Sequence, residues 1–136
     1  MYGDTAAGRK RAAQLREQGG DVRALAARLV SQAEAVPWHG KAAEAMRERI
    51  RERANHLRAA AAQHDTAAES LAAHFVEVDR LKEGIDVRSR KATTLVEDAR
   101  TRTSEGTADD TDAALVAFDP PPAGHRDWLT VELPGL

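Results

Sequence analysis

Residues 37–40 read Pro37-Trp38-His39-Gly40 and separate two long stretches with helical periodicity. Proline disfavours the helical conformation at the residue before it, and glycine adopts backbone angles that other residues avoid. The stretch therefore predicts a tight reversal of the chain. Because two helices joined by so short a connection run antiparallel, the sequence predicts a helical hairpin with these residues as its turn.

The first helix of this hairpin is predicted from Asp4 to Val36. Its larger apolar residues recur at spacings of seven, three, four and seven, which place them on one helical stripe: Leu15, Val22, Leu25, Leu29 and Val36. Asp4 and Thr5 are the expected N-cap. Since the stripe stays in phase across Gly19-Gly20, we expect one helix with a soft kink there, and Asp21 as a fresh N-cap if the helix breaks.

The second helix is predicted from Lys41 to about Glu83. Its inward stripe consists of Met46, Ile50, Leu57, Ala61, His64, Ala68, Leu71, Phe75 and Val78. On the outer face, the three-apart pairs Glu44 with Arg47 and Glu48 with Arg51 are expected to be solvated ion pairs that contribute about 0.2–0.5 kcal/mol each.

Beyond Gly84 the pattern changes twice. Apolar residues at three- and four-residue spacing predict a further helix from about Asp86 to Arg102, which either extends the second helix or folds back. Residues 103–125 are rich in Thr, Asp, Gly and Pro and predict a flexible linker, with one transient helical turn at 113–118. Residues 128–133 alternate in polarity and predict a short strand.

These elements predict three segments: a hairpin at 1–84, an accessory helix at 85–103 and an acidic, Pro-containing tail at 104–136. The net charge is about +4 up to residue 103 and −6 after it. The expected tail is therefore solvated.

The composition favours thin helical layers. Alanine supplies 28 of the 136 residues, whereas tryptophan, tyrosine and phenylalanine together supply five. Because alanine favours helices and lets them approach closely, we expect an all-α hairpin that dimerises into a four-helix bundle, with an extra C-terminal helix and a flexible tail. The expected dimer interface consists of residues from the apolar stripes: Leu25, Leu29, Met46, Ile50, Leu57, Leu71, Phe75 and Val78.

Residue patterns that carry chemistry are missing. Without cysteine there is no disulfide, thiol nucleophile or thiolate metal site. The histidines lack the three- or four-residue spacing of a helical metal site, and the sequence has no Gly-x-Ser-x-Gly elbow or glycine-rich phosphate loop. We expect no enzyme activity, no metal and no cofactor. His64 is expected to be a core or interface residue, with a pH-sensitive dimer as the alternative.

Membrane and nucleic-acid partners are not expected either. No segment approaches the roughly 20 apolar residues of a membrane span. Residues 1–11 lack the apolar part of a secretory signal, so any export is expected to use another route. The basic clusters Arg9-Lys10-Arg11 and Arg88-Ser89-Arg90-Lys91 are diluted by neighbouring acids, which disfavours binding to phosphates.

Trp38-x-Gly40 in the turn of an Ala-rich hairpin resembles the WXG family of small helical-hairpin proteins, which includes the ESAT-like antigens. The resemblance covers about residues 4–84, and Lys41-Ala42-Ala43-Glu44-Ala45-Met46-Arg47 is typical of actinobacterial relatives. Members pair as homodimers or heterodimers and leave the cell through type VII secretion machinery without a cleaved signal. The resemblance implies that Trp38 and Gly40 form a turn used in export recognition. The alternative is that Trp38 only caps the bundle end.

The second export element of that family is Tyr-x-x-x-Asp/Glu, and the nearest match here is Phe75 with Asp79. Phenylalanine replaces tyrosine, so the hydroxyl of the motif is lost and the motif does not predict export of this chain alone. A chain without the full signal is expected to travel on a partner's signal or to act as the cytosolic partner of a larger exported toxin. The alternative places Phe75 in the core and Asp79 on the surface.

The resemblance therefore implies a non-enzymatic secretion substrate or toxin partner, cytoplasmic before export and secreted or on the cell surface afterwards. Its implied partners are a second copy or a related WXG-like protein, a larger toxin, or the secretion ATPase. The alternative from the residues alone is an intracellular coiled-coil adaptor unrelated to secretion.

Overall fold

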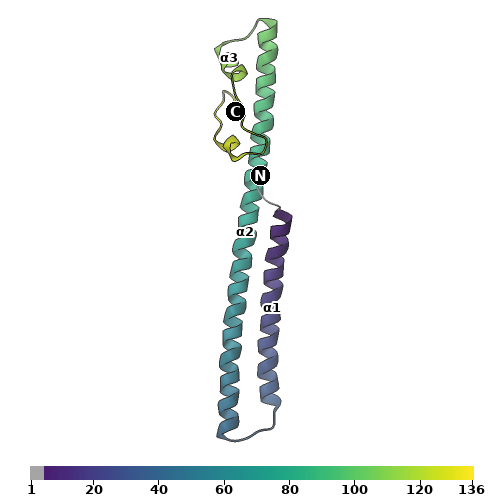
Figure 1. Ribbon diagram of the computed structural model, residues 1–136, viewed down its shortest axis with the longest axis vertical. Coiled ribbons are helices and arrows are strands. Elements are labelled where there is room, and N and C mark those ends of the chain that lie inside the picture. The colour runs from purple at the N-terminus through teal and green to yellow at the C-terminus, as the bar shows by residue number, and fades with distance from the viewer. Residues whose placement is uncertain (1–4) are drawn as a thin grey trace. The chain divides into compact units, whose positions relative to one another are not determined.

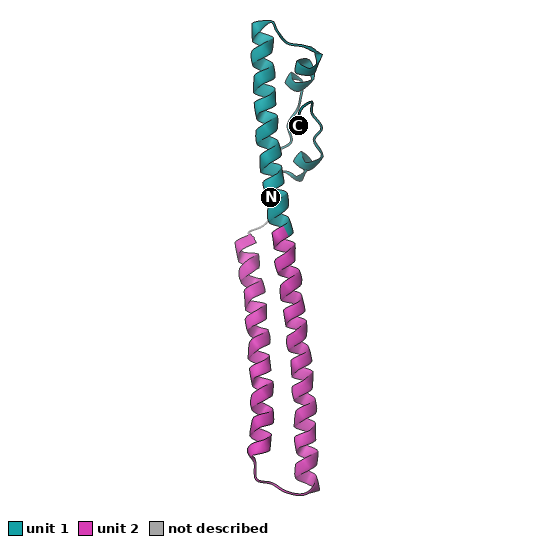
Figure 2. Ribbon diagram, turned by 180° about the vertical axis from the view of Figure 1, so that it is seen from behind, with its two compact units in different colours: residues 1–3, 77–136 teal, residues 4–76 magenta. Residues whose placement is uncertain are grey.

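The computed structural model describes residues 5–136, and the regular elements in this range are all helical (Figure 1). They are α1 (Thr5–Ala35), α2 (Lys41–Glu105), α3 (Asp110–Val116) and a 3-10 helix, η1 (Arg126–Thr130). The predicted all-α class is confirmed. In Figure 2 the chain divides into two compact units, residues 5–76 and residues 77–136 of the described part, and α2 supplies residues to both.

In the first unit, α1 and residues 41–76 of α2 lie side by side and antiparallel (Figures 1 and 2). Gly8 lies beside Phe75 and Gly19 beside Ala61, while Glu34 near the other end of α1 is 4.0 Å from Arg51. The first helix ends two residues before Pro37, as the proline predicts. Asp4, one of the two expected capping residues, lies outside the described residues.

The seam between the two helices is made of small residues at seven-residue intervals. Its buried members are Ala12, Gly19 and Ala26 in α1, and Ala54, Ala61 and Ala68 in α2. A seven-residue repeat is what two supercoiled helices need to keep one face in contact, and small side chains bring the backbones close. The hairpin therefore has a thin core without large buried side chains.

Gly19 is part of this seam and not a weak point of α1. A Cβ atom on Gly19 would lie 3.2 Å from the carbonyl oxygen of Ala61 and 3.0 Å from a carboxylate oxygen of Asp65. Around neighbouring Gly20 nothing lies within 4 Å of such an atom. α1 is continuous through both glycines, so Asp21 begins no new helix.

In the second unit, the predicted accessory helix extends the second helix. α2 continues through Gly84 to Glu105 without a break. A Cβ on Gly84 would lie 3.6 Å from a methyl group of Leu129, an ordinary contact distance, so this glycine faces the folded tail. Of the two alternatives left open by the sequence, the structure has the extension, and the contact with the tail counters the helix-propensity loss of about 1 kcal/mol at Gly84.

The prediction of a flexible linker at residues 103–125 is wrong. α2 extends to Glu105, and α3 begins at a capping box in which Asp109 accepts from the backbone of Asp112 at 2.9 Å and the Asp112 carboxylate accepts from the Asp109 N–H at 3.2 Å. Acidic residues at a helix N-terminus satisfy otherwise unpaired amides. The acidic composition that predicted solvation therefore starts a short helix.

The predicted strand at residues 128–133 is also wrong, because residues 128–130 lie in the 3-10 helix η1 and residues 131–133 form no strand. The Trp128 N–H donates to the His125 carbonyl at 3.2 Å, and the Asp127 N–H donates to the His125 ring at 3.1 Å. A strand needs a neighbouring strand for its backbone hydrogen bonds, and residues 5–136 contain none.

Trp128 forms the centre of the second unit and is 5% exposed. It clusters with Ile85 and Ala92 of α2, and its ring meets Phe118 edge-on at 6.1 Å between centroids. Its indole N–H donates to the Pro122 carbonyl at 3.1 Å. The tail therefore supplies the large side chain that covers this part of α2.

Candidate partner-binding surface

One flank of the hairpin carries most of its larger apolar side chains, together with the exposed Arg11 and Arg53, each one position before a seam alanine. We call this flank the apolar face and define it by the following residues: Leu15, Val22, Leu25, Leu29, Met46, Ile50, Leu57 and Leu71. Each lies either three positions after or one position before a position of the seven-residue seam series, which Arg47 extends in α2 towards the turn. At about 100° per residue both positions fall on the same flank of a helix. Because the two helices are antiparallel and use the same repeat, their flanks fall on the same side of the hairpin.

Two observations support this geometry. Val36, Met46 and Ile50 line one small hollow of about 50 Å³, so residues from both sides of the turn meet on this face. Leu25 is 45% exposed and Met46 is 47% exposed, while the other members of the apolar face are half-buried. The hairpin alone therefore leaves this face incompletely covered.

The opposite flank of the seam is charged. Arg23 forms an ion pair with Asp65 across the hairpin, and Arg51 approaches Glu34. The hydrogen bond from Arg23 lowers the pKa of the Asp65 carboxyl group below its ordinary value. These side chains are solvated, so the ion pairs contribute little to stability. Their main consequence is that the hairpin has a charged flank opposite the apolar face.

The eight predicted interface residues fall into three groups. Leu25, Leu29, Met46, Ile50, Leu57 and Leu71 belong to the apolar face. Phe75 packs within the hairpin, where its ring covers Gly8: a Cβ on Gly8 would lie 2.0 Å from the ring. Val78 lies in the other unit, where it lines an apolar groove with Leu81, Ile85 and Leu129. The structure thus brings six of the eight onto one surface.

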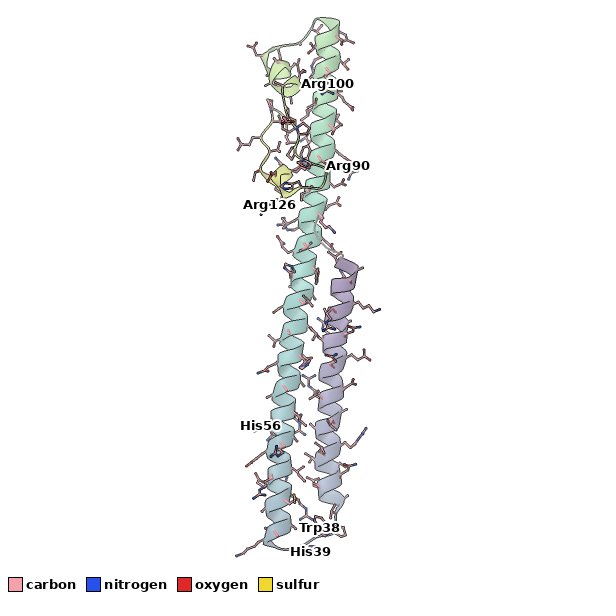
Figure 3. The ribbon with its side chains drawn as sticks, in the orientation of Figure 1. Trp38, His39, His56, Arg90, Arg100 and Arg126 are labelled. Atoms are coloured by element: carbon pink, nitrogen blue, oxygen red, sulfur yellow. The ribbon has the colours of Figure 1, made fainter. Side chains whose placement is uncertain are left out.

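Trp38 lies in the turn, at one end of the apolar face (Figure 3). Its side chain is 60% exposed and lines a hollow of about 260 Å³ with His39, Ala42, Ala43 and Met46. Gly40 has a φ angle of +100°, which favours glycine, and its carbonyl accepts from the Glu44 N–H at 3.1 Å to begin α2. The turn therefore presents a large aromatic surface next to exposed Met46.

Arg47 holds the turn together, a role that the sequence analysis missed. Its guanidinium donates to the carbonyls of Val36 at 2.8 Å, Trp38 at 2.7 Å and Ala33 at 3.3 Å. The last carbonyls of a helix have no partner within it, and a cation there is favourable. The predicted pairing with Glu44 is therefore wrong, whereas Glu48 and Arg51 do pair at 3.3 Å.

A signal for this role is present in the sequence. Arg47 occupies the position seven residues before Ala54, in series with the small seam residues Ala54, Ala61 and Ala68. A charged residue in such a place needs a partner for its charge. The acceptors within its reach are the Ala33 carbonyl at the end of α1 and the Val36 and Trp38 carbonyls of the turn.

Phe75 and Asp79, the other predicted motif, lie in different units. Besides covering Gly8, Phe75 meets His74 edge-on at 5.4 Å between ring centroids. This packing accounts for Phe75 without an export role. Asp79 is half-buried on α2.

Within residues 5–136 no three His, Asp or Glu side chains come together as a metal site. His64, half-buried beside the seam, is 3.0 Å from the Ala60 carbonyl through its Nδ1. None of the helices in this range is long and apolar enough to cross a bilayer.

Comparisons with known protein families, curated proteins and solved structures find no match for this chain.

Proposed function

We propose that this protein binds another helical chain through the apolar face, forming a four-helix bundle with a second copy or a related hairpin. The observation that carries the proposal is the one-sided exposure of Leu25 and Met46 on a hairpin whose own seam is alanine and glycine. Apolar area removed from water contributes about 25 cal/mol per Å². A second hairpin laid on this face would bury the side chains that the first leaves exposed, while the charged flank stays in water.

We propose further that the paired protein is a substrate of type VII secretion or the partner of an exported toxin. This step rests on the resemblance of Trp38-x-Gly40 to the WXG family. It is supported by the place of Trp38, which is exposed in the turn and adjoins the apolar face. Exposed tryptophan is a frequent anchor in protein recognition, because it offers a large rigid apolar surface.

Export of the full chain into culture supernatant tests the secretion role. The test compares the original chain with Trp38→Ala, and His39→Ala is the matched control because His39 is exposed in the same turn. We expect Trp38→Ala to reduce export at least about tenfold, equivalent to about 1.4 kcal/mol of recognition, with the amount inside the cell unchanged. His39→Ala should export normally.

Equal export of all three chains contradicts a signal role for Trp38. A chain that pairs through the apolar face but never reaches the supernatant is instead an intracellular adaptor. The two parts of the proposal can therefore fail separately.

A further inference from the structure

The seven-residue repeat of α2 continues beyond the hairpin. Leu57 and Leu71 belong to a series of positions spaced by seven that continues with Ile85, Ala92 and Ala99. In the hairpin these positions are half-buried, and so is Val78 at the start of the second unit, whereas Ile85, Ala92 and Ala99 are buried with at most 4% exposed. Within the second unit, the C-terminal segment supplies the cover.

This cover consists of irregular chain and two short helical elements. Trp128 packs on Ile85 and Ala92, and the partly buried Phe118, Val131, Leu133 and Leu136 pack around that cluster. α3 lies beside the last turns of α2 (Figures 1 and 2), where Ala99 is fully buried. A single short segment thus occupies the apolar stripe over about four helical turns.

Two arginines of α2 fasten the cover. The Arg102 guanidinium forms a fork with the buried Asp112 carboxylate, with contacts of 2.7, 2.9 and 3.0 Å. Arg88 donates to the Trp128 carbonyl at 2.9 Å and also to the Val131 carbonyl. Paired forks of this kind fix orientation as well as distance. The cover is therefore held by directional contacts at two places.

We infer that residues 107–136 are an autoinhibitory cover: they occupy a helix-pairing stripe of α2 at Ile85, Ala92 and Ala99, which a second chain can use only when the cover lifts. The competing partner is the same stripe of a second copy. Ala92 and Ala99 are small, as Ala61 and Ala68 are in the hairpin seam, and residues of this size let a helix approach closely. The kind of partner rests on the proposed function, which is helix pairing. The cover itself rests on the contacts that the tail makes with α2.

The test uses the full chain carrying Leu25→Glu and Met46→Glu, a background in which pairing through the apolar face is blocked. Either Trp128→Ala or Asp112→Asn is added to release the cover, the second being a milder change that keeps the side-chain size. Val116→Ala is the matched control, because Val116 is an exposed apolar residue of α3. Hydrogen exchange of residues 107–136 reports release, and sedimentation equilibrium gives the association constant.

We expect both releasing variants to lose protection in the tail and to associate at least about tenfold more tightly, because the covered state no longer competes with pairing. Val116→Ala should change neither quantity. A released tail with an unchanged association constant overturns the inference, as does a tail that stays protected in both variants.

The chain without the two glutamate substitutions is measured in parallel. If it does not self-associate, pairing through the apolar face fails, but the comparison in the blocked background still decides the role of the cover.

Discussion

The two units cover the same helical repeat in different ways. In the hairpin, α1 meets α2 along alanine and glycine, and no large side chain is fully buried. In the second unit, the tail meets α2 through Trp128 and needs Arg88 and Arg102 to hold it. The hairpin leaves its apolar face incompletely covered, whereas the tail buries Ile85, Ala92 and Ala99 of the series that continues along α2.

The difference follows from the backbone of each covering element. A helix satisfies its own backbone hydrogen bonds, so α1 needs only small side chains that let it approach α2. Irregular chain must find partners for its carbonyls, and Arg88 supplies them for Trp128 and Val131. An irregular cover therefore depends on a few large contacts, and a helical cover on many small ones.

Trp128→Ala should have the largest effect on stability. Removing a buried aromatic side chain costs about 3–5 kcal/mol. Because the second unit is small, this loss should unfold the tail, which then loses its hydrogen-exchange protection while the hairpin keeps its own. The other tryptophan is the control: Trp38 is exposed, and Trp38→Ala should change hairpin stability by less than about 0.5 kcal/mol. A tail that remains protected in Trp128→Ala would refute the dependence on one large contact.

The paired glycines test the close seam of the hairpin. Gly19→Leu should destabilise the hairpin by about 1–3 kcal/mol, because the larger side chain must displace the backbone of Ala61. Gly20→Ala should stabilise it by about 0.5–1 kcal/mol, because the position is open and alanine favours helix. Urea unfolding followed by helical circular dichroism measures both. Equal responses at the two glycines would argue against close packing at Gly19.

Arg47→Met tests the clamp on the turn. Loss of the charged hydrogen bonds to three carbonyls should cost about 1–2 kcal/mol, less than a fully buried set because water can reach the turn. Arg49→Met is the matched control, since Arg49 is exposed and lies two residues further along the same helix. The urea midpoints of the two variants should differ. Identical midpoints would show that Arg47 does not stabilise the turn.

Acid should release the tail before it affects the hairpin seam. Hydrogen bonds from Arg102, and then from the Asp109 backbone, lower the pKa of Asp112 below its ordinary value. A lowered pKa in the folded state contributes stability that is complete above the ordinary carboxyl value of about 3.9 and is lost as the pH falls through the lowered value. Tail protection should therefore be constant from neutral to mildly acidic pH and fall only below that range.

Asp112→Asn removes this dependence, so the tail protection that it has already weakened at neutral pH should not fall further across the acid range. The hairpin's Asp65 also has a lowered pKa, set first by the hydrogen bond from Arg23, but its seam of alanines does not titrate. Loss of the hairpin and the tail at the same pH would contradict the separation of the two units.

Periodicity was sufficient to predict the hairpin. Pro37 and Gly40 marked the turn, and the ends of α1 and the start of α2 followed from them. The apolar stripe in the sequence does not distinguish the seam from the apolar face. Ala61 lies in the seam and Leu57 on the apolar face because α1 approaches α2 closely, and that approach depends on both helices. The sequence predicts a soft kink at Gly19-Gly20 for the same reason, because the role of Gly19 in the seam depends on its neighbours in α2.

The folded tail was harder to predict because its contacts join residues far apart in sequence. Arg88 donates to carbonyls some forty positions away in the sequence. The proline and acidic residues of the segment are also typical of flexible chain, so its composition does not predict a folded structure. One signal was available: two of the chain's five aromatics, Phe118 and Trp128, lie in it. Large aromatic side chains are uncommon in chain that stays solvated.

The central claim is that the apolar face of the hairpin is covered by another chain. Sedimentation of the full chain tests it most directly, with Leu25→Glu/Met46→Glu as the variant and Val76→Glu as the control, since Val76 is an exposed apolar residue outside that face. We predict twice the chain mass of 14.7 kDa for the original protein and the control, and the single-chain mass for the variant, with equal helical content in all three. A single-chain mass for the original protein, or a double mass that survives both glutamates, would contradict the account.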